Sequence, residues 1–493
     1  MPRFGFDNSY ARDLPGASMP WQPSPAPAPR LLFANPALAD ELGLPPGLFD
    51  GPDAAALFAG NQLPEDAQPI AQAYAGHQFG GFSPQLGDGR ALLLGEVLDR
   101  AGRRRDIAFK GSGRTPFSRG GDGKAAVGPM LREVLIGEAM HALGIPTTRA
   151  LAVVATGEAV RRETALPGAV LTRVAASHLR VGTCQFFAAR GDLDGLRRLV
   201  DYAIARHDPD LIGQPGRELA LLRAVARRQA RLIAQWMNVG FIHGVMNTDN
   251  MALSGETIDY GPCAFMEAYD PAAVFSSIDH AGRYAYGNQP AIAQWNLARF
   301  AETLLPLMAD EDDEPAIERV VAEATAVIDE LAGWLDAERL AGQRLKLGLT
   351  SDEAADATLA ADWLGLLHAQ SVDFTLAWRL LAGAAEGRPE PLRDQFHDRA
   401  ALDAWLARWR ERLAGDGAPE AAAARMRRAS PAVIPRNHLV EAALDAATAG
   451  DLQPFDTLLA RLREPWDEAA LATPFGQPAP SEVTARYRTF CGT

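Results

Sequence analysis

The stretch Phe241–Phe265, FIHGVMNTDNMALSGETIDYGPCAF, combines a polar loop with an acidic–aromatic–glycine triplet, Asp259-Tyr260-Gly261. The polar residues of the loop are His243, Asn247, Asp249 and Asn250. Between the loop and the triplet, two short strand-like segments (251–253 and 257–258) flank a Ser-Gly turn, which predicts a hairpin that returns Asp259 to the side of Asn250. A carboxylate and an amide oxygen are hard ligands of the kind that Mg²⁺ prefers when it also holds substrate phosphates.

The order of these groups is typical of a kinase-like site, in which a loop Asp and Asn precede a metal-binding Asp in an Asp-Phe-Gly-type triplet. We therefore predict that Asn250 and Asp259 bind the metal and that Asp249 acts as the base. The alternative is an acidic turn followed by an ordinary hairpin. Four polar groups and a triplet in this order favour the site.

Composition limits the class of protein. The chain has 493 residues, 47% of them apolar and 22% charged, as in soluble globular proteins of more than one domain. The net charge of −14 argues against a general nucleic-acid binder. Three cysteines and no apolar leader or membrane-length apolar run predict a cytoplasmic protein without a membrane partner. The sequence leaves its oligomeric state open.

A glycine-rich segment, Gln72–Gly89, precedes two predicted strands at 90–97 and 105–110. Glycines let backbone N–H groups approach phosphate oxygens closely, and Lys110 ends the second strand as the phosphate-binding lysine of kinase-like folds does. A helix predicted over 129–143 carries Glu133 and Glu138, and either could pair with Lys110. Spacing does not choose between them, and a solvated helix face is the alternative for each.

Two further strands are predicted at 145–156 and 168–174, and they lead to Arg173 and Arg180. Guanidinium groups bind phosphate bidentately, so these arginines could clamp a polyphosphate, although surface ion pairing is the alternative for each taken alone. An amphipathic helix over Glu218–Val239 then leads into the polar loop. The aromatic and polar segment 275–300 is a candidate substrate-facing surface.

The chain contains several long motifs: FDNSYA at 6–11, YAGHQFGGFSPQLGDGRA at 74–91, FKGSGRTPFSRGGDG at 109–123, ALGIPTTRAL at 142–151, HGVMNTDNM at 243–251, IDYGPCAF at 258–265 and NQPAIAQWNLARF at 288–300. These motifs resemble the selenoprotein O family over essentially the whole length of the chain. The resemblance implies a protein-kinase-like fold and a protein adenylyltransferase, which moves AMP from ATP onto Ser, Thr or Tyr hydroxyls of target proteins. It also implies a flipped nucleotide with an exposed α-phosphate.

Carried over by motif, the resemblance implies roles for particular residues. The implied nucleotide contacts are Gly87, Gly89, Arg90, Lys110, Asp122, Gly123, Arg173, Arg180 and Asp259. Glu133 would pair with Lys110 and Asp249 would accept the proton. Asn250 and Asp259 would hold Mg²⁺, with Mn²⁺ as the alternative metal. Eukaryotic members carry selenocysteine near the C-terminus, where this chain has Cys491. A disulfide between Cys491 and Cys263 is a hypothesis, with burial as the alternative for Cys263.

Pattern and resemblance together predict an α+β, two-lobed, protein-kinase-like fold with an N-terminal extension and a helical C-terminal extension. The predicted parts are an N-terminal arm with short helices (1–70), a small nucleotide-binding lobe (71–180), a larger helical lobe with the catalytic loop (181–310) and a helical C-terminal region with a tail (311–493). Two other functions compete with AMP transfer: a kinase, and a nucleotide-binding pseudokinase scaffold. The loop reads His-Gly-Val-Met rather than His-Arg-Asp, so the usual kinase base is absent from its position.

Overall fold

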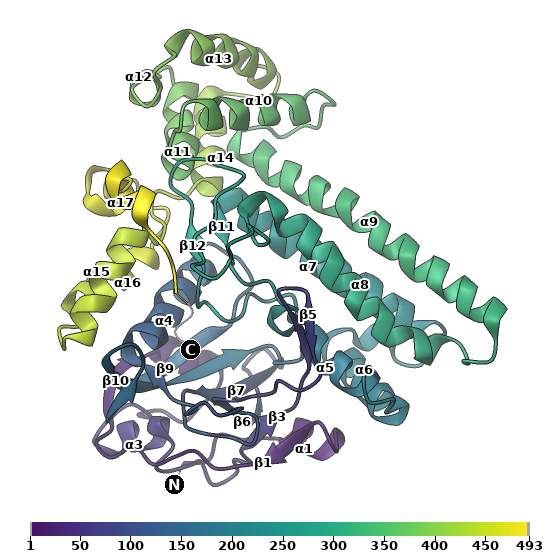
Figure 1. The fold of residues 1–493 in the computed structure, drawn as a ribbon. Helices are drawn as coiled ribbons and strands as arrows, with labels where there is room; N and C mark the ends of the chain where they lie inside the picture. The colour runs from purple at the N-terminus through teal and green to yellow at the C-terminus, as the bar shows by residue number, and fades with distance from the viewer. Residues whose placement is uncertain (1, 491–493) are drawn as a thin grey trace.

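The computed structural model describes residues 2–490 and confirms the α+β class. The long strands all lie before residue 176, and most of the chain after Val181 is helical (Figure 1). No helix within the described residues is long and apolar enough to cross a membrane.

The main sheet is antiparallel, in the order β1-β3-β6-β7-β10-β9-β2, with β8 paired to β10. Its strands are β1 (Ser18–Pro20), β2 (Arg30–Ala34), β3 (Ile70–Gln72), β6 (Ala91–Leu98), β7 (Arg104–Lys110), β8 (Ala125–Ala126), β9 (Arg149–Arg161) and β10 (Ala165–Ala175). Two small sheets are formed by β4 (Gly76–Gln78) with β5 (Gly81–Ser83), and by β11 (Phe241–Ile242) with β12 (Ala264–Phe265). The N-terminal arm thus supplies both edge strands of the main sheet.

The register of β7 and β10 sets one face of this sheet. Lys110 lies opposite Leu171, and Arg173 lies opposite Ala108. Side chains alternate along a strand, so Asp106, Lys110 and Arg173 all point to the same face. The strands predicted at 90–97, 105–110, 145–156 and 168–174 are confirmed as β6, β7, β9 and β10, with shifted ends.

The helices before the polar loop are α1 (Ser9–Asp13), α2 (Pro36–Glu41), α3 (Asp53–Ala59), α4 (Val127–Ala142), α5 (Val181–Ala188), α6 (Leu193–His207) and α7 (Arg217–Val239). The helices after it are α8 (Gln289–Met308), α9 (Glu314–Lys346), α10 (Asp356–Ala369), α11 (Phe374–Ala385), α12 (Glu390–Arg393), α13 (Arg399–Leu413), α14 (Pro419–Ala429), α15 (Asn437–Thr448), α16 (Gln453–Leu462) and α17 (Ser481–Arg486). Helices α7, α8 and α9 pack against one another beside the sheet (Figure 1).

The polar loop begins where α7 ends. Gly240 adopts a left-handed conformation (φ 74°) after Val239, the usual way for a helix to terminate at glycine. The chain then enters β11, which pairs with β12 beyond the triplet. Residues 243–263 therefore form a loop whose two ends are held together by this strand pair. This pairing brings the loop and the triplet together.

The hairpin predicted over 251–258 is wrong. Its turn exists, because Gly255 N–H donates to Ala252 O at 3.1 Å. However, Ala252 forms a bridge with Arg180, and Thr257 forms a bridge with Thr147. Arms of two or three residues make a hairpin only marginally stable, so each segment pairs with the body of the protein instead.

Candidate active site

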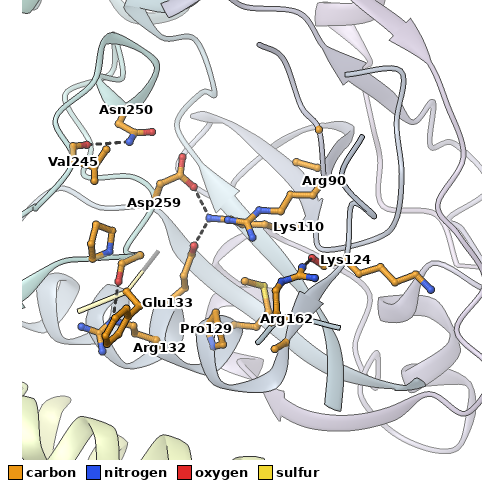
Figure 2. A pocket seen from close by; sticks show the side chains of 18 of the residues that line it. Arg90, Lys110, Lys124, Pro129, Arg132, Glu133, Arg162, Val245, Asn250 and Asp259 are labelled. Atoms are coloured by element: carbon orange, nitrogen blue, oxygen red, sulfur yellow. Dashed lines mark hydrogen bonds and ion pairs between the residues drawn. The ribbon is translucent and has the colours of Figure 1, made fainter. Parts of the chain in front are cut away.

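One cavity of about 1530 Å³ is lined by the twelve residues predicted to bind the nucleotide, pair with Lys110, hold the metal or act as the base, and Figure 2 shows part of it. These are Gly87, Gly89, Arg90, Lys110, Asp122, Gly123, Glu133, Arg173, Arg180, Asp249, Asn250 and Asp259. They come from the loop before β6, the end of β7, the loop before β8, α4, β10, the start of α5 and the catalytic loop. The cavity therefore lies where the sheet, α4 and the polar loop meet.

Lys110 is buried and its Nζ contacts two carboxylates, Glu133 Oε1 and Asp259 Oδ1 (Figure 2). Glu133 is thus the helix residue that the structure brings to Lys110. Glu138 lies farther along α4 and pairs instead with Arg149 (2.6 Å) and Arg463 (2.9 Å). The two glutamates that the sequence left open have separate partners.

Asp259 is the anion on which the cations of the site converge. Its Oδ1 accepts a hydrogen bond from Nη1 of Arg173 at 2.7 Å. Its Oδ2 lies 3.6 Å from Nη1 of Arg180. Burial alone would raise the pKa of Asp259, but Lys110, Arg173 and Arg180 together hold it well below its usual value. Asp259 has a φ of 65°, a conformation that is uncommon for a residue other than glycine.

Surface ion pairing is the wrong interpretation of Arg173 and Arg180, because each is only 3% exposed. Arg180 also donates to the backbone oxygen of Asp249 at 3.1 Å, and its guanidinium lies 4.5 Å from the centre of the Tyr74 ring. These contacts hold the Arg180 guanidinium against the polar loop.

Asp249 is buried beside the cavity, and its burial raises its pKa to about 6 although Arg180 opposes the shift. Its Oδ2 accepts a hydrogen bond from Gln78 Nε2 at 3.2 Å. Its Oδ1 has no hydrogen-bond partner within the described residues. A carboxylate in this state stays ionised above about pH 6 and keeps accepting capacity for an incoming proton.

Asn250 and Asp259 lie on the catalytic-loop side of the cavity, and Lys110 approaches Asp259 from the sheet (Figure 2). Asn250 Nδ2 donates to Val245 O at 3.0 Å, which leaves the amide oxygen as the free acceptor of that side chain. Within residues 2–490, no cluster of three or more His, Cys, Asp or Glu could hold a metal ion. Two oxygen donors fit Mg²⁺ only where phosphates and water complete the coordination.

The glycines of the cavity are explained by close packing between its two loops. Gly87 has a φ of 88°, and a Cβ there would lie 2.5 Å from Cγ of Phe117. Gly123 has a φ of 70°, and a Cβ there would lie 2.1 Å from the oxygen of Gly113. Any side chain would force these loops apart. Next to Gly123, the carboxylate of Asp122 pairs with Arg162 at 2.9 Å.

His243, one of the four polar residues of the loop, does not line the cavity. It is buried, its Nε2 donates to Ile258 O at 2.9 Å and its ring stacks on Trp236. The residue therefore ties the loop to the segment before the triplet. Its apolar neighbours Phe241 and Ile242 were the sequence signal for this buried role.

The hairpin formed by β4 and β5 was not predicted from the sequence. Three of its groups hold the catalytic loop: His77 N–H donates to Thr248 Oγ1 (2.7 Å), Phe79 N–H donates to Asn247 Oδ1 (3.1 Å), and Gln78 contacts Asp249 as described. The available signal was the Gly80-Gly81 pair between His-Gln-Phe and Phe-Ser. The hairpin was not recognised because the whole segment Gln72–Gly89 was interpreted as a glycine-rich loop that approaches phosphate.

Comparisons with known proteins identify the family of the chain. The model of the family described as protein adenylyltransferase SelO matches residues 12–463. Proteins named protein nucleotidyltransferase YdiU are similar over nearly the full length of both chains. The one from Cereibacter sphaeroides is 62% identical over 99% of this chain and 100% of its own, and the one from Mycobacterium sp. is 56% identical over 100% of both. The one from Chromobacterium violaceum is 62% identical over 97% of this chain and 100% of its own. The resemblance found in the motifs is confirmed: the chain belongs to the protein adenylyltransferase SelO family.

Proposed function

We propose that this nucleotidyltransferase moves AMP from ATP to Ser, Thr or Tyr hydroxyls of target proteins and releases pyrophosphate. The observation that carries the proposal is the convergence of Lys110, Arg173 and Arg180 in one cavity with a separate buried carboxylate, Asp249. The three cations would bind the negative charges of a polyphosphate, and Asp249 would accept the proton of an attacking hydroxyl. The family assignment supports AMP as the transferred group.

In this reaction the hydroxyl oxygen forms a bond with the α-phosphorus, and the bond from that phosphorus to its bridging oxygen breaks. The proton of the hydroxyl passes to Asp249, and pyrophosphate takes up the negative charge of the bridging oxygen. A base is most effective when its pKa lies near the working pH, and the pKa of Asp249, about 6, is close to neutrality. Arg173 and Arg180 would stabilise charge on the phosphates through N–H donors held in place by burial.

The donor set of the site fits Mg²⁺, or Mn²⁺ as the alternative. Asp259 and Asn250 would hold the ion, which would neutralise phosphate charge when bound. Asp259 would then be shared between the metal and its arginine and lysine partners.

The fold supports a protein-kinase-like arrangement, which is part of the proposal. The contact of Lys110 on β7 with Glu133 on α4 corresponds to the Lys–Glu ion pair of kinases. The small lobe would comprise residues 71–180 and the larger lobe residues 181–310, with extensions at both ends.

The acceptor protein would approach past the β4–β5 hairpin. Phe79 at its tip and Ile278 in the segment 275–300 both line the cavity and are 39% and 46% exposed. Exposed apolar side chains beside a catalytic site suit contact with a protein substrate. The position of Ile278 supports a substrate-facing role for part of the segment 275–300.

The test is mass analysis of target protein and enzyme after incubation with ATP and Mg²⁺. Label on the α-phosphate should remain on protein, and label on the γ-phosphate should leave with pyrophosphate. Asp249→Asn should still bind ATP but lose transfer by roughly 100-fold or more, because only the proton acceptor is removed. Stable γ-label on a hydroxyl would instead show a kinase, and ATP binding without any transfer would show a nucleotide-binding scaffold.

A further inference from the structure

The orientation of Arg173 depends on a residue that lies outside the cavity. Arg173 sits on β10, and its Nη1 donates to Asp259 as described. At the other side of its guanidinium, Nε donates to Nε2 of His178 at 3.2 Å. His178 is buried in the turn after β10 and does not line the cavity. The Nε side of the Arg173 guanidinium is therefore held by the imidazole of His178.

The tautomer of His178 follows from its partners. Its Nδ1 lies 2.9 Å from Asp106 Oδ2, and its backbone N–H donates to the same oxygen at 2.8 Å. A carboxylate only accepts, so Nδ1 carries the hydrogen. An arginine N–H only donates, so Nε2 must carry a lone pair. Both bonds are satisfied only by the neutral ring with hydrogen on Nδ1, and burial, which lowers the pKa of His178, favours that form.

Asp106 is itself firmly held. It is buried on β7, two residues from the position opposite Arg173, and so it lies on the same face of the sheet. Its Oδ1 contacts Nη2 of Arg206. Burial would raise the pKa of Asp106, but Arg206 and His178 hold it well below the usual value, so it remains an ionised acceptor. Strand β7 and Arg206 on α6 thus hold the Asp106 carboxylate in place, and this carboxylate in turn holds the His178 imidazole.

We propose that His178 is a positioning residue, which Asp106 holds in one tautomer so that it orients the Arg173 guanidinium toward Asp259 and the phosphates of the nucleotide. The proposal rests on the proposed function for the identity of the ligand, ATP. His178 touches neither the cavity nor the reacting atoms. Its effect passes through the single hydrogen bond from Arg173 Nε, which restricts the rotation of a long side chain before the nucleotide binds.

Two substitutions separate the two hydrogen bonds of the ring. His178→Asn retains a donor near the position of Nδ1 for Asp106, but nothing in it reaches Arg173. His178→Gln extends an acceptor oxygen toward Arg173. The matched control is His207→Gln, because His207 lies in the same region and binds Ser177 Oγ at 2.7 Å but has no contact with Arg173. Affinity for ATP is measured by calorimetry on the full chain, together with KM, kcat and the thermal unfolding midpoint.

We expect His178→Asn to weaken ATP binding and raise the KM for ATP roughly ten-fold, the scale of a lost hydrogen bond to a charged group. His178→Gln should restore most of the affinity, and His207→Gln should leave it unchanged. Equal affinity of folded His178→Asn and wild-type protein would overturn the proposal, as would equal losses in the Asn and Gln variants. Wild-type protein that binds ATP but transfers no AMP would refute only the proposed reaction. Wild-type protein that does not bind ATP would refute both proposals.

Discussion

Two glutamates on one helix, Glu133 and Glu138, have different ion-pair partners. Glu133 and Glu138 are both buried acidic residues of α4, and both pair with cations. Glu133 contacts the lysine of the cavity, whereas Glu138 binds two arginines that connect α4 to β9 and to the end of α16. The first pair belongs to the site and the second to the scaffold.

Glu133→Gln should raise the KM for ATP about ten-fold or more, because Lys110 loses a charged partner and its Nζ moves toward Asp259. Glu138→Gln is the matched control. It should lower the thermal unfolding midpoint by weakening two ion pairs but leave the KM for ATP within about two-fold. Steady-state kinetics and thermal unfolding of both variants check the prediction. A larger rise of KM in Glu138→Gln than in Glu133→Gln would contradict it.

At the scale of elements, the β4–β5 hairpin acts as a support for the catalytic loop. Its backbone and one side chain contact Thr248, Asn247 and Asp249. The same Oδ1 of Asn247 also accepts a hydrogen bond from the hydroxyl of Tyr284 at 2.6 Å. The hairpin also packs closely on the loop. A Cβ at Gly76 would lie 2.9 Å from Asp249 Oδ1 and 3.0 Å from Cδ1 of Leu86.

Gly76→Ala should therefore displace Asp249 and reduce kcat by roughly ten-fold or more while the KM for ATP changes little. Gly81→Ala, on the other strand of the same hairpin, is the control, since the nearest atom to its Cβ is Gln78 O at 3.5 Å. Neither glycine has a positive φ, so backbone strain does not separate the two variants. Measured rates that fall equally in both variants would show that the hairpin tolerates no alanine and that contact with Asp249 is not the cause.

The contact between α9 and α11 contains a buried lysine, Lys346, whose charged form destabilises the folded protein. Lys346 ends α9, and its Nζ lies 5.6 Å and 5.3 Å from the ring centres of Phe374 and Trp378 on α11. Burial lowers its pKa to about 7. Below about pH 7 the folded protein must bury a charge that the unfolded chain exposes to water.

The sign of the resulting pH dependence follows. Between about pH 7 and 10.5 the unfolded chain keeps the proton and the folded protein does not, so stability rises with pH in this window. Lys346→Met should remove this rise and stabilise the protein at and below pH 7, by on the order of a few kcal/mol. Urea unfolding at several pH values tests both statements. A variant that is less stable than wild type at pH 6.5 would contradict them.

At the scale of the whole molecule, the C-terminal segment returns to the centre of the fold (Figure 1). Thr489 N–H donates to Phe275 O at 2.8 Å, and its Oγ1 donates to Pro262 O at 2.6 Å. This places the segment beside Cys263, which is fully buried and whose pKa burial raises to about 11. The disulfide hypothesised between Cys263 and Cys491 concerns a residue outside the described part of the chain.

Deletion of residues 481–493 should expose Cys263 to alkylation at pH 8, since the thiolate forms more readily once water reaches the thiol. Cys184 serves as an internal control, because it is buried in α5 away from this segment and should stay unreactive. Peptide mapping after alkylation measures both. If Cys263 is as unreactive in the truncated chain as in the full chain, the C-terminal segment is not what covers it. Mapping of the full chain under non-reducing conditions tests the disulfide itself.

The local elements and the residues that line the cavity were predictable from the sequence. The strand-like segments 90–97, 105–110 and 168–174 predicted β6, β7 and β10, and the amphipathic pattern of 218–239 predicted α7, because such patterns are properties of neighbouring residues. The long family motifs named residues that all line one cavity. Those motifs record which residues occur together, and they do not describe contacts.

Which of these residues contact one another depends on how the distant parts of the chain pack. Glu133 and Glu138 are five positions apart, about 140° around a helix, and packing of α4 on the sheet turns one of them toward Lys110. Burial of Arg173 and Arg180, the failure of the 251–258 hairpin and the structural place of His243 likewise depend on partners distant in sequence. Short polar segments carry too little local preference to choose between a near and a distant partner, so the packed core makes that choice.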